Sequence, residues 1–386
     1  MKILIISKCP THPTNAGNRW GILAQAQILQ KLGNEIHFLY VQELPMRLNV
    51  ISFQKDLEGT SKYWGNRFHL YNVPKITKLC FNIKKYIDKA LFDNYFKVEE
   101  TYPKGLNSYV AKLQTKEHFD ICIVNYVYLT KLFTKVNFPK TAVFTHDCMS
   151  YKNLIVNESC RTMNAHQEAI ALQRCQHIFA VQDEEMAYFH LLSPKSKVYN
   201  IYSKYDYHPQ DIVNNHNIVF LSGSNPYNVH GIHWFVKEIW PLVIKRFSDA
   251  QLIIGGSICK VIKDIEGIAG IAGIKLYGFV DVPADFYAQA DVAINPVFQG
   301  TGLKIKTFEA ISYDKVTLVH PHSMAGVFRK EEAPLLASDN PEEWVKMLEK
   351  VWNSTEFIKQ HKLQNKRFLK EMNEFIVNEY KRFLDA

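Results

Sequence analysis

The chain of 386 residues has a formal net charge of +8, with 47% apolar and 22% charged residues. Its length exceeds one ordinary hydrophobic core and indicates about two or three domains, and its composition is that of an ordinary soluble globular protein. The sequence has no uncharged apolar run near the roughly 18 residues of a membrane span. Its start is typical of a strand and not of a secretory signal. Its seven scattered cysteines, without a C-x-x-C pair, favour reduced thiols in a cytoplasm over disulfides or a zinc site.

The chain begins with a predicted strand, helix and strand. These elements are Lys2–Ser7, Arg19–Leu32 with Gly33 as its C-terminal cap, and Glu35–Tyr40. A βαβ unit of this kind opens a doubly wound domain. Gly17 lies between the first strand and the first helix, where such a fold presents a loop to a ligand, although an ordinary strand-to-helix turn is the alternative.

A basic amphipathic helix is predicted at Leu79–Phe96, where lysines alternate with apolar residues. Such a helix can lie on an anionic membrane surface or hold an acidic acceptor. A packed helix with a solvated lysine face is the favoured interpretation. The mild positive charge of the chain fits a phosphate-bearing ligand or an anionic surface without selecting either.

A His-Asp pair ends the predicted strand Thr141–Asp147, which follows another strand at Phe119–Tyr126. Ligands bind open α/β sheets at the carboxyl ends of the strands, so His146 is a candidate hydrogen-bonding group or base. A structural histidine bound to a backbone carbonyl is the alternative. A helix (Glu158–Cys175), a strand (His177–Gln182), a helix (Asp183–Leu192) and a strand (Lys197–Ile201) complete this half before a polar crossing segment.

The alternation of strands and helices then restarts at Asn217. The predicted elements are strands Asn217–Gly223, Ala250–Gly256, Ile274–Val280, Asp291–Pro296 and Val316–His320, with helices at Ile232–Arg246, from Pro283 and from Ile305. This second βαβ start indicates two doubly wound halves with a cleft between them.

The segment Gly300–Ala310, GTGLKIKTFEA, follows one of these strands and is predicted to be a glycine loop that opens a helix. Backbone amides at such a turn, together with the helix dipole, favour a phosphate. At about 100° per residue Gly302, Lys306 and Glu309 would share one helix face, and Lys304 would lie opposite or in the loop. Lysine suits phosphate and Glu309 suits ribose hydroxyls, whereas a solvated surface helix is the equally weighted alternative.

Several other chemistries have no motif in this sequence. The chain has no D-x-D pair for a divalent cation, no phosphate-binding loop of the G-x-x-x-x-G-K type, no G-x-S-x-G and no H-E-x-x-H. Basic residues form no stripe with interleaved aromatics, so nucleic-acid binding has no support. The charge of a leaving diphosphate would therefore be met by helix dipole, amides and lysine, without metal.

Over most of its length the chain resembles the glycosyltransferase group 1 enzymes (family four). The most specific similarity is ADVAINPVFQGTGLKIKTFEA (Ala290–Ala310), and the segments Pro13–Ile36, Thr145–Asn153, His166–Phe189 and Asn217–Val243 resemble further parts of that family. The resemblance implies the GT-B architecture and transfer of a sugar from a nucleotide sugar with retention at the anomeric carbon.

The resemblance also assigns roles to individual residues. It implies that Glu309 binds ribose, that His146 lies near the reacting sugar and that Gly17 belongs to the opposite wall. The residues expected to bind the donor are Gly17, Ser224, Asn228, the backbone of Gly278, Phe279 and Val280 for the base, and Gly300, Thr301, Gly302 and Leu303 for phosphate. The residues expected to take part in catalysis are His146, Lys304, Lys306 and Glu309. The residues expected on the acceptor side are Arg19 and Asp147.

Two positions depart from the family pattern. Thr301 stands where the family often has a second glutamate that touches the donor sugar, which leaves the identity of that sugar open. The Arg and Lys that the family has after the first strand of its second domain are replaced by Ser224, Asn228 and His230, so Lys304 or Lys306 is expected to meet the diphosphate.

We therefore predict an α/β protein of GT-B architecture, with two doubly wound Rossmann-like domains facing a cleft. Residues 1–205 would form the acceptor-side domain and residues 206–369 the nucleotide-sugar domain, with a helix at about 370–386 packing back on the first.

The predicted activity is a retaining hexosyltransferase reaction that needs no metal or other cofactor. The enzyme would use a UDP or GDP sugar and a glycan or lipid-linked acceptor, in surface polysaccharide or glycoconjugate synthesis. We expect it in the cytoplasm, and peripheral contact with the inner face of the cell membrane is a further hypothesis. A nucleotide-sugar epimerase and a non-catalytic nucleotide-sugar-binding partner protein are the alternatives.

Overall fold

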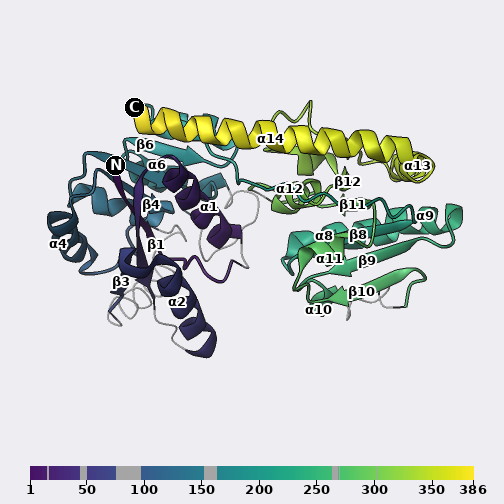
Figure 1. The fold of residues 1–386 in the computed structure, drawn as a ribbon, viewed down its shortest axis with the longest axis horizontal. Coiled ribbons are helices and arrows are strands. Elements are labelled where there is room, and N and C mark those ends of the chain that lie inside the picture. Colours follow the sequence, from purple (N-terminus) through teal and green to yellow (C-terminus); the bar gives the residue numbers. More distant parts are fainter. Residues whose placement is uncertain are drawn as a thin grey trace. The chain divides into compact units, whose positions relative to one another are not determined.

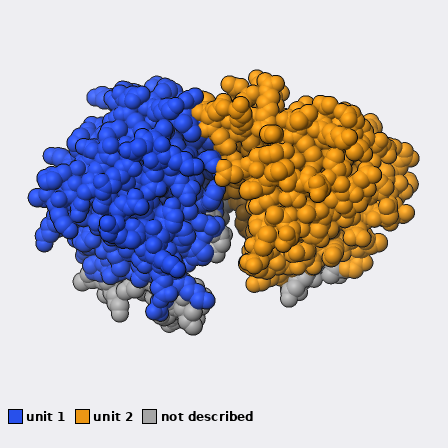
Figure 2. Space-filling view, viewed as in Figure 1, with its two compact units in different colours: residues 1–204, 376–386 blue, residues 205–375 orange. Residues whose placement is uncertain are grey.

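A computed structural model describes residues 1–14, 17–43, 50–74, 97–151, 163–262, 268, 270–300 and 302–386 (Figure 1). The chain forms two compact units: unit 1 comprises Met1–Lys204 and Ile376–Ala386, and unit 2 comprises Tyr205–Phe375 (Figure 2). The predicted helix Leu79–Phe96 and the position Thr301 lie outside the described residues.

Unit 1 contains a parallel sheet with strand order β3-β2-β1-β4-β5-β6-β7. Its strands are β1 (Lys2–Ser7), β2 (Glu35–Gln42), β3 (Phe68–Asn72), β4 (Ile121–Asn125), β5 (Lys140–Phe144), β6 (His177–Ala180) and β7 (Lys197–Asn200). The inner strands are buried along their length, which explains why they appear in the sequence as unbroken apolar runs. From β1 the sheet extends to one side through β2 and β3, and to the other side through β4 and the later strands. Ligands of doubly wound sheets bind at the reversal point between two such strands, here β1 and β4.

The described helices of unit 1 are α1 (Gly17–Lys31), α2 (Val50–Trp64), η1 (Gly65–Arg67), α4 (Leu106–Glu117), η2 (Val127–Thr134), α6 (Ala165–Leu172) and α7 (Asp183–Leu192). The predicted helix Glu158–Cys175 extends beyond the observed helix α6 on both sides. Met163 and Asn164 are not helical, and Asn164 caps α6 by accepting a hydrogen bond from the Gln167 amide. Asparagine at this position begins a helix because its side chain satisfies a free amide of the first turn.

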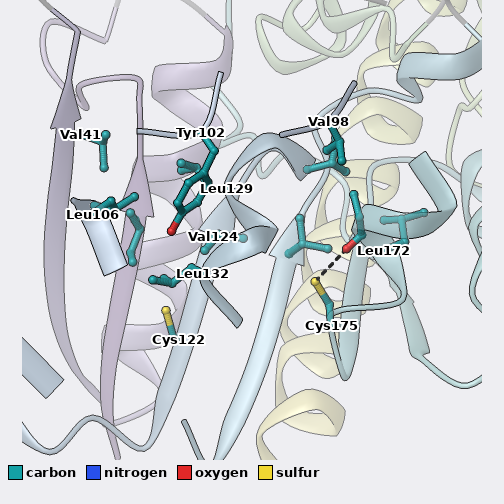
Figure 3. Close-up of a cluster of buried hydrophobic side chains, with 14 of the residues drawn as sticks. Val41, Val98, Tyr102, Leu106, Cys122, Val124, Leu129, Leu132, Leu172 and Cys175 are labelled. Atoms are coloured by element: carbon teal, nitrogen blue, oxygen red, sulfur yellow. Dashed lines mark hydrogen bonds between the residues drawn. The ribbon is translucent and has the colours of Figure 1, made fainter. Parts of the chain in front are cut away.

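The core of unit 1 joins strands and helices in one cluster of buried side chains. Val41 of β2 and Val124 of β4 belong to it together with Leu106 of α4, Leu132 of η2 and Leu172 of α6 (Figure 3). Each is fully buried, and burial of such a side chain stabilises the fold by about 1.5–3 kcal/mol. This packing fixes the sheet whose strand ends carry His146.

Unit 2 contains a second parallel sheet, with strand order β10-β9-β8-β11-β12-β13. Its strands are β8 (Asn217–Leu221), β9 (Gln251–Gly255), β10 (Ile274–Gly278), β11 (Val292–Asn295), β12 (Val316–Val319) and β13 (Leu335–Ala337). Its helices are α8 (Pro226–Trp234), η3 (Phe235–Ile239), α9 (Trp240–Arg246), α10 (Cys259–Ile262), α11 (Pro283–Tyr287), α12 (Ile305–Ser312), η4 (Pro321–Met324), α13 (Pro341–Trp352) and the first part of α14 (Thr355–Asp385). Here the reversal falls between β8 and β11.

The predicted helix Ile232–Arg246 begins six residues earlier and is not uniform. Pro226 occupies its first turn and the Asn225 side chain caps it, as proline and asparagine do at helix starts. The segment η3 has π geometry next to Pro241. Proline lacks the amide that would continue the α-helical ladder, which accounts for a local change of helix type there.

Helix α14, the long yellow helix in Figure 1, contributes residues to both units. Its last part belongs to unit 1, where the rings of Tyr380 and Phe383 lie 5.8 and 4.8 Å from that of Phe179. Among the described residues, no helix combines the length and the apolar character that crossing a membrane requires.

Candidate active site

The glycine loop of unit 2 follows β11 and depends on two left-handed glycines. Gly300 has φ +99° and Gly302 has φ +73°, which other residues adopt only with strain. The prediction that Gly302 shares a helix face with Lys306 and Glu309 is wrong, because α12 begins only at Ile305. Lys306 and Glu309 lie three residues apart within α12 and are neighbours on its surface.

The segments that follow β8 and β11, the two strands at the reversal point of unit 2, meet at Lys306. The Lys306 Nζ donates a hydrogen bond of 2.7 Å to Asn228 Oδ1 on α8. The Asn228 Nδ2 in turn donates to the carbonyl of Gly223, 3.0 Å away, just after β8. Residues 78 positions apart in sequence are thereby joined at the edge where doubly wound sheets bind ligands.

The two lysines of the loop have different surroundings. Lys304 is 8% exposed, and its Nζ donates to the carbonyls of Gly300 at 3.4 Å and Gly302 at 3.1 Å, so it braces the glycine loop. Burial, and then the charge of Lys304, lowers the pKa of Lys306 to about 8, with the Glu309 carboxylate opposing the shift. Lys306 therefore carries a positive charge at neutral pH, close to its point of neutralisation.

Glu309 is enclosed by tyrosines. Within the part of the chain that the structure describes, its Oε2 accepts a hydrogen bond from the Tyr287 hydroxyl at 3.5 Å. Burial raises the pKa of Glu309, while the bond from Tyr287 and the charge of Lys306 lower it. The Tyr287 ring is held by stacking on Tyr313, with ring centroids 4.8 Å apart. A carboxylate with few internal partners suits hydroxyl donors from a ligand.

The remaining candidates of unit 2 form a chain of turns at the same sheet edge. The Ser224 amide donates to Ser257 Oγ at 3.2 Å, after β9. The Gly256 amide donates to the carbonyl of Gly278, the last residue of β10, at 2.7 Å. Phe279 is 80% exposed and Val280 packs against the core. The Leu303 carbonyl accepts from the Ile305 amide at 2.9 Å, which turns the loop into α12.

In unit 1, the predicted strand Thr141–Asp147 ends as β5 already at Phe144, and His146 lies two residues beyond it with a left-handed backbone, φ +63°. Its ring lies against Phe144 and Tyr126, at centroid distances of 4.2 and 4.5 Å, and its Nε2 is 2.8 Å from Asn125 Oδ1. The Asn125 Nδ2 donates to the Ile6 carbonyl at 3.3 Å. The Asn125 oxygen therefore faces the histidine, so Nε2 carries the proton and Nδ1 keeps a lone pair.

His146 is a neutral group at physiological pH. Burial lowers its pKa to about 3, because the apolar rings around it disfavour a charged imidazole. Such a ring can accept a hydrogen bond through Nδ1 but cannot serve as a cation for a phosphate.

The other candidates of unit 1 have different surroundings. A Cβ added at Gly21 would lie 3.9 Å from the imidazole, so α1 passes close to this ring, and Gly17 is the first residue of that helix. Arg19 forms a bidentate ion pair with Asp56, at 2.9 and 2.8 Å. Burial, and then the charge of Asp147, raises the pKa of the carboxyl of Glu185.

Three contributors were not anticipated from the sequence: Tyr287, Asn125 and Tyr126. Asn125 and Tyr126 are the last two residues of the predicted strand Phe119–Tyr126, and Asn125 ends β4, so the strand-end rule could have found both. Tyr287 lies in a short helix with no motif, and only the fold brings it to Glu309. The described residues contain no group of three or more His, Cys, Asp or Glu side chains suited to a metal.

Comparisons with known proteins bear on the fold of the chain and on the family of its second unit. Residues 215–354 match the family model described as Glycosyl transferases group 1. A Klebsiella pneumoniae protein described as an uncharacterized 44.6 kDa protein in the cps region is 22% identical over 340 residues, which cover 80% of each chain.

Two solved structures share the fold over nearly the whole chain. Sucrose-phosphate synthase from Thermosynechococcus elongatus superposes with a TM-score of 0.69 at 12% identity, covering 100% of this chain and 98% of that one. Anabaena HepE in complex with UDP gives a TM-score of 0.63 at 12% identity, covering 99% and 100%. The fold is thus GT-B, with two Rossmann-like domains, and the chain is a glycosyltransferase that carries a group 1 domain in its second unit.

Proposed function

We propose that the chain transfers a sugar from a UDP-sugar to a glycan or lipid-linked acceptor, with retention at the anomeric carbon, in the synthesis of a surface polysaccharide or glycoconjugate. The observation that carries the proposal is the meeting of Lys306, Asn228 and the glycine loop beside Glu309. UDP in the HepE complex supports uridine over guanosine. The relative in the cps region supports polysaccharide synthesis.

Charge and hydrogen bonding in unit 2 suit a nucleoside diphosphate. We assign the diphosphate to Lys306 and to the amides of the glycine loop and the first turn of α12, where the helix dipole favours an anion. Lys304 keeps the loop in shape through its two carbonyl contacts. Glu309 accepts hydrogen bonds from ribose hydroxyls. As the bond from the anomeric carbon to the phosphate breaks, Lys306 stabilises the charge that develops on the leaving diphosphate.

His146 is assigned to the transferred sugar or the acceptor, as a neutral hydrogen-bond acceptor through Nδ1. Its lone pair suits a substrate hydroxyl, and its low pKa keeps that lone pair available over the physiological range. Asp147 and Arg19 are assigned to the acceptor side, where Arg19 supports the local fold through its ion pair with Asp56.

Isothermal titration calorimetry with UDP, GDP, ADP and CMP tests the donor site. We expect UDP to bind most tightly, and Lys306→Met and Glu309→Gln to weaken UDP binding about tenfold or more, as loss of a charged hydrogen-bonding partner does. Lys237→Met is the matched control, because Lys237 is an exposed lysine of the same unit whose partner is its neighbour Glu238. Unchanged UDP affinity in both site variants would contradict the assignment.

Product analysis tests the reaction itself. With a UDP-sugar and a glycan acceptor, we expect a new glycosidic bond whose anomeric configuration by NMR is that of the donor, and turnover about a hundredfold lower in Lys306→Ala and Glu309→Ala. Inversion would refute retention. Interconversion of the nucleotide sugar without acceptor would indicate an epimerase, and tight UDP binding without transfer would indicate a binding protein.

A further inference from the structure

Two successive backbone amides that follow the His146-Asp147 pair point at one buried carboxylate. The Met149 and Ser150 amides donate to Glu168 Oε1 and Oε2, at 2.9 and 3.0 Å. These amides include the first donors of a helical turn at 149–151, and such donors have no partner within their own helix.

This carboxylate comes from another helix of the same unit. Glu168 lies in α6 and is 0% exposed. Ser150 Oγ also donates to Glu168 and contacts the Tyr188 hydroxyl at 2.9 Å. Burying a carboxylate is costly unless it is well bonded, and here the bonds to one short segment of backbone supply that compensation.

This segment determines where His146 stands. A non-glycine residue with φ +63° is strained by about 1 kcal/mol or more, so both flanks need to be fixed. On the strand side, the Thr145 amide and hydroxyl both donate to the Phe179 carbonyl, at 3.1 and 3.0 Å. On the other side the Met149 and Ser150 amides are held by the carboxylate of Glu168.

We infer that Glu168 is a positioning residue for the transfer reaction, which acts by clamping residues 149–150 and thereby orienting His146. The inference rests on the proposed role of His146 in transfer. This carboxylate is not required to touch a substrate, and it does not belong to the donor site of unit 2.

Hydrogen–deuterium exchange of the full chain tests the clamp without any substrate. In Glu168→Gln, one amide faces a nitrogen in place of an oxygen, so we expect exchange in the peptide covering residues 145–151 to be about tenfold faster. Glu379→Gln is the matched control, because Glu379 is also buried in unit 1 and accepts the Asn200 amide at 3.3 Å. Unchanged exchange at 145–151, or equal acceleration in the control, would overturn the clamp.

Kinetics separate positioning from a general loss of stability. In Glu168→Gln we expect kcat for transfer from a UDP-sugar to fall about tenfold, while the Kd for UDP, measured by calorimetry, stays within twofold of the wild type. Normal kcat together with fast exchange at 145–151 would overturn the positioning role. A fall in kcat that Glu379→Gln reproduces would assign the effect to stability and overturn it as well.

The failure of the proposed function has a different signature. If the wild type transfers no sugar, or if His146→Ala transfers at the normal rate, the proposed function or the role of His146 is refuted. The exchange experiment still decides whether Glu168 holds residues 149 and 150. If Glu168→Gln does not fold, Ser150→Ala removes only the hydroxyl contact, and transfer and exchange equal to wild type in Ser150→Ala would overturn the inference.

Discussion

Lys306 has an ammonium group that titrates close to physiological pH. Burial and the charge of Lys304 lower its pKa to about 8, so the group is charged below that pH and neutral above it. The charged form is the one that attracts a diphosphate. The affinity for UDP should therefore be high at pH 7 and fall as the pH rises through the pKa of Lys306.

Calorimetry at pH 7, 8 and 9 and constant ionic strength measures this dependence. At one unit above its pKa Lys306 is about 90% neutral, so we expect the Kd for UDP to rise about tenfold by pH 9. Lys306→Arg keeps its charge over this range and should show a much flatter profile. A wild-type Kd that does not change between pH 7 and 9 would contradict the role of Lys306.

At the scale of elements, the donor site depends on how closely α8 approaches the end of β11. A Cβ built on Gly231 of α8 would lie 2.9 Å from the Cα of Val297 and 3.0 Å from the carbonyl oxygen of Pro296. Backbone atoms cannot move aside as a flexible side chain can. The glycine therefore allows the helix that carries Asn228 to reach the strand that leads to Lys306.

We expect Gly231→Ala to destabilise the protein by about 1–3 kcal/mol, although alanine is the better helix former. Chemical denaturation followed by tryptophan fluorescence measures the change. Gly223→Ala is the control, since its added Cβ would approach Ser257 Oγ only to 3.9 Å, and it should cost less than about 0.5 kcal/mol. Equal stability of both variants would show that the approach of α8 to β11 is not tight.

At the scale of the whole molecule, the end of the chain completes the core of the first unit. Ile376 and Phe383 of α14 are fully buried, and the Phe383 ring also contacts His177 at 5.1 Å. The first and last parts of the sequence are thus folded together in unit 1. The stability of this unit should depend on the last eleven residues.

Phe383→Ala is expected to destabilise unit 1 by about 3–5 kcal/mol, through lost burial and the cavity that remains. Leu191→Ala on α7 is the control in the same unit, because Leu191 is 75% exposed and has little to lose. Differential scanning calorimetry would detect the change as a lower Tm for the transition of unit 1. An unchanged Tm in Phe383→Ala would mean that the helix end contributes little to this core.

The sequence by itself determined the alternation of strands and helices and the position of the glycine loop. Buried parallel strands must be apolar throughout, so Lys2–Ser7 and Asn217–Leu221 could be recognised from composition alone. It did not reveal β3 or β13, because these edge strands are only partly buried and lack such a run. The glycine loop could be recognised because such a turn needs left-handed backbone angles, which glycine adopts without the strain that other residues suffer.

Only the tertiary structure decided which side chains meet. Lys304 and Lys306 are equivalent candidates in sequence, yet the start of α12 between them turns one amine onto the carbonyls of the loop and the other toward Asn228. Tyr287 reaches Glu309, and Glu168 reaches residues 149 and 150, from elements whose own sequences carry no motif. Local pattern fixes an element because its cause is local, whereas contacts between elements follow from strand order and helix packing, which depend on the whole chain at once.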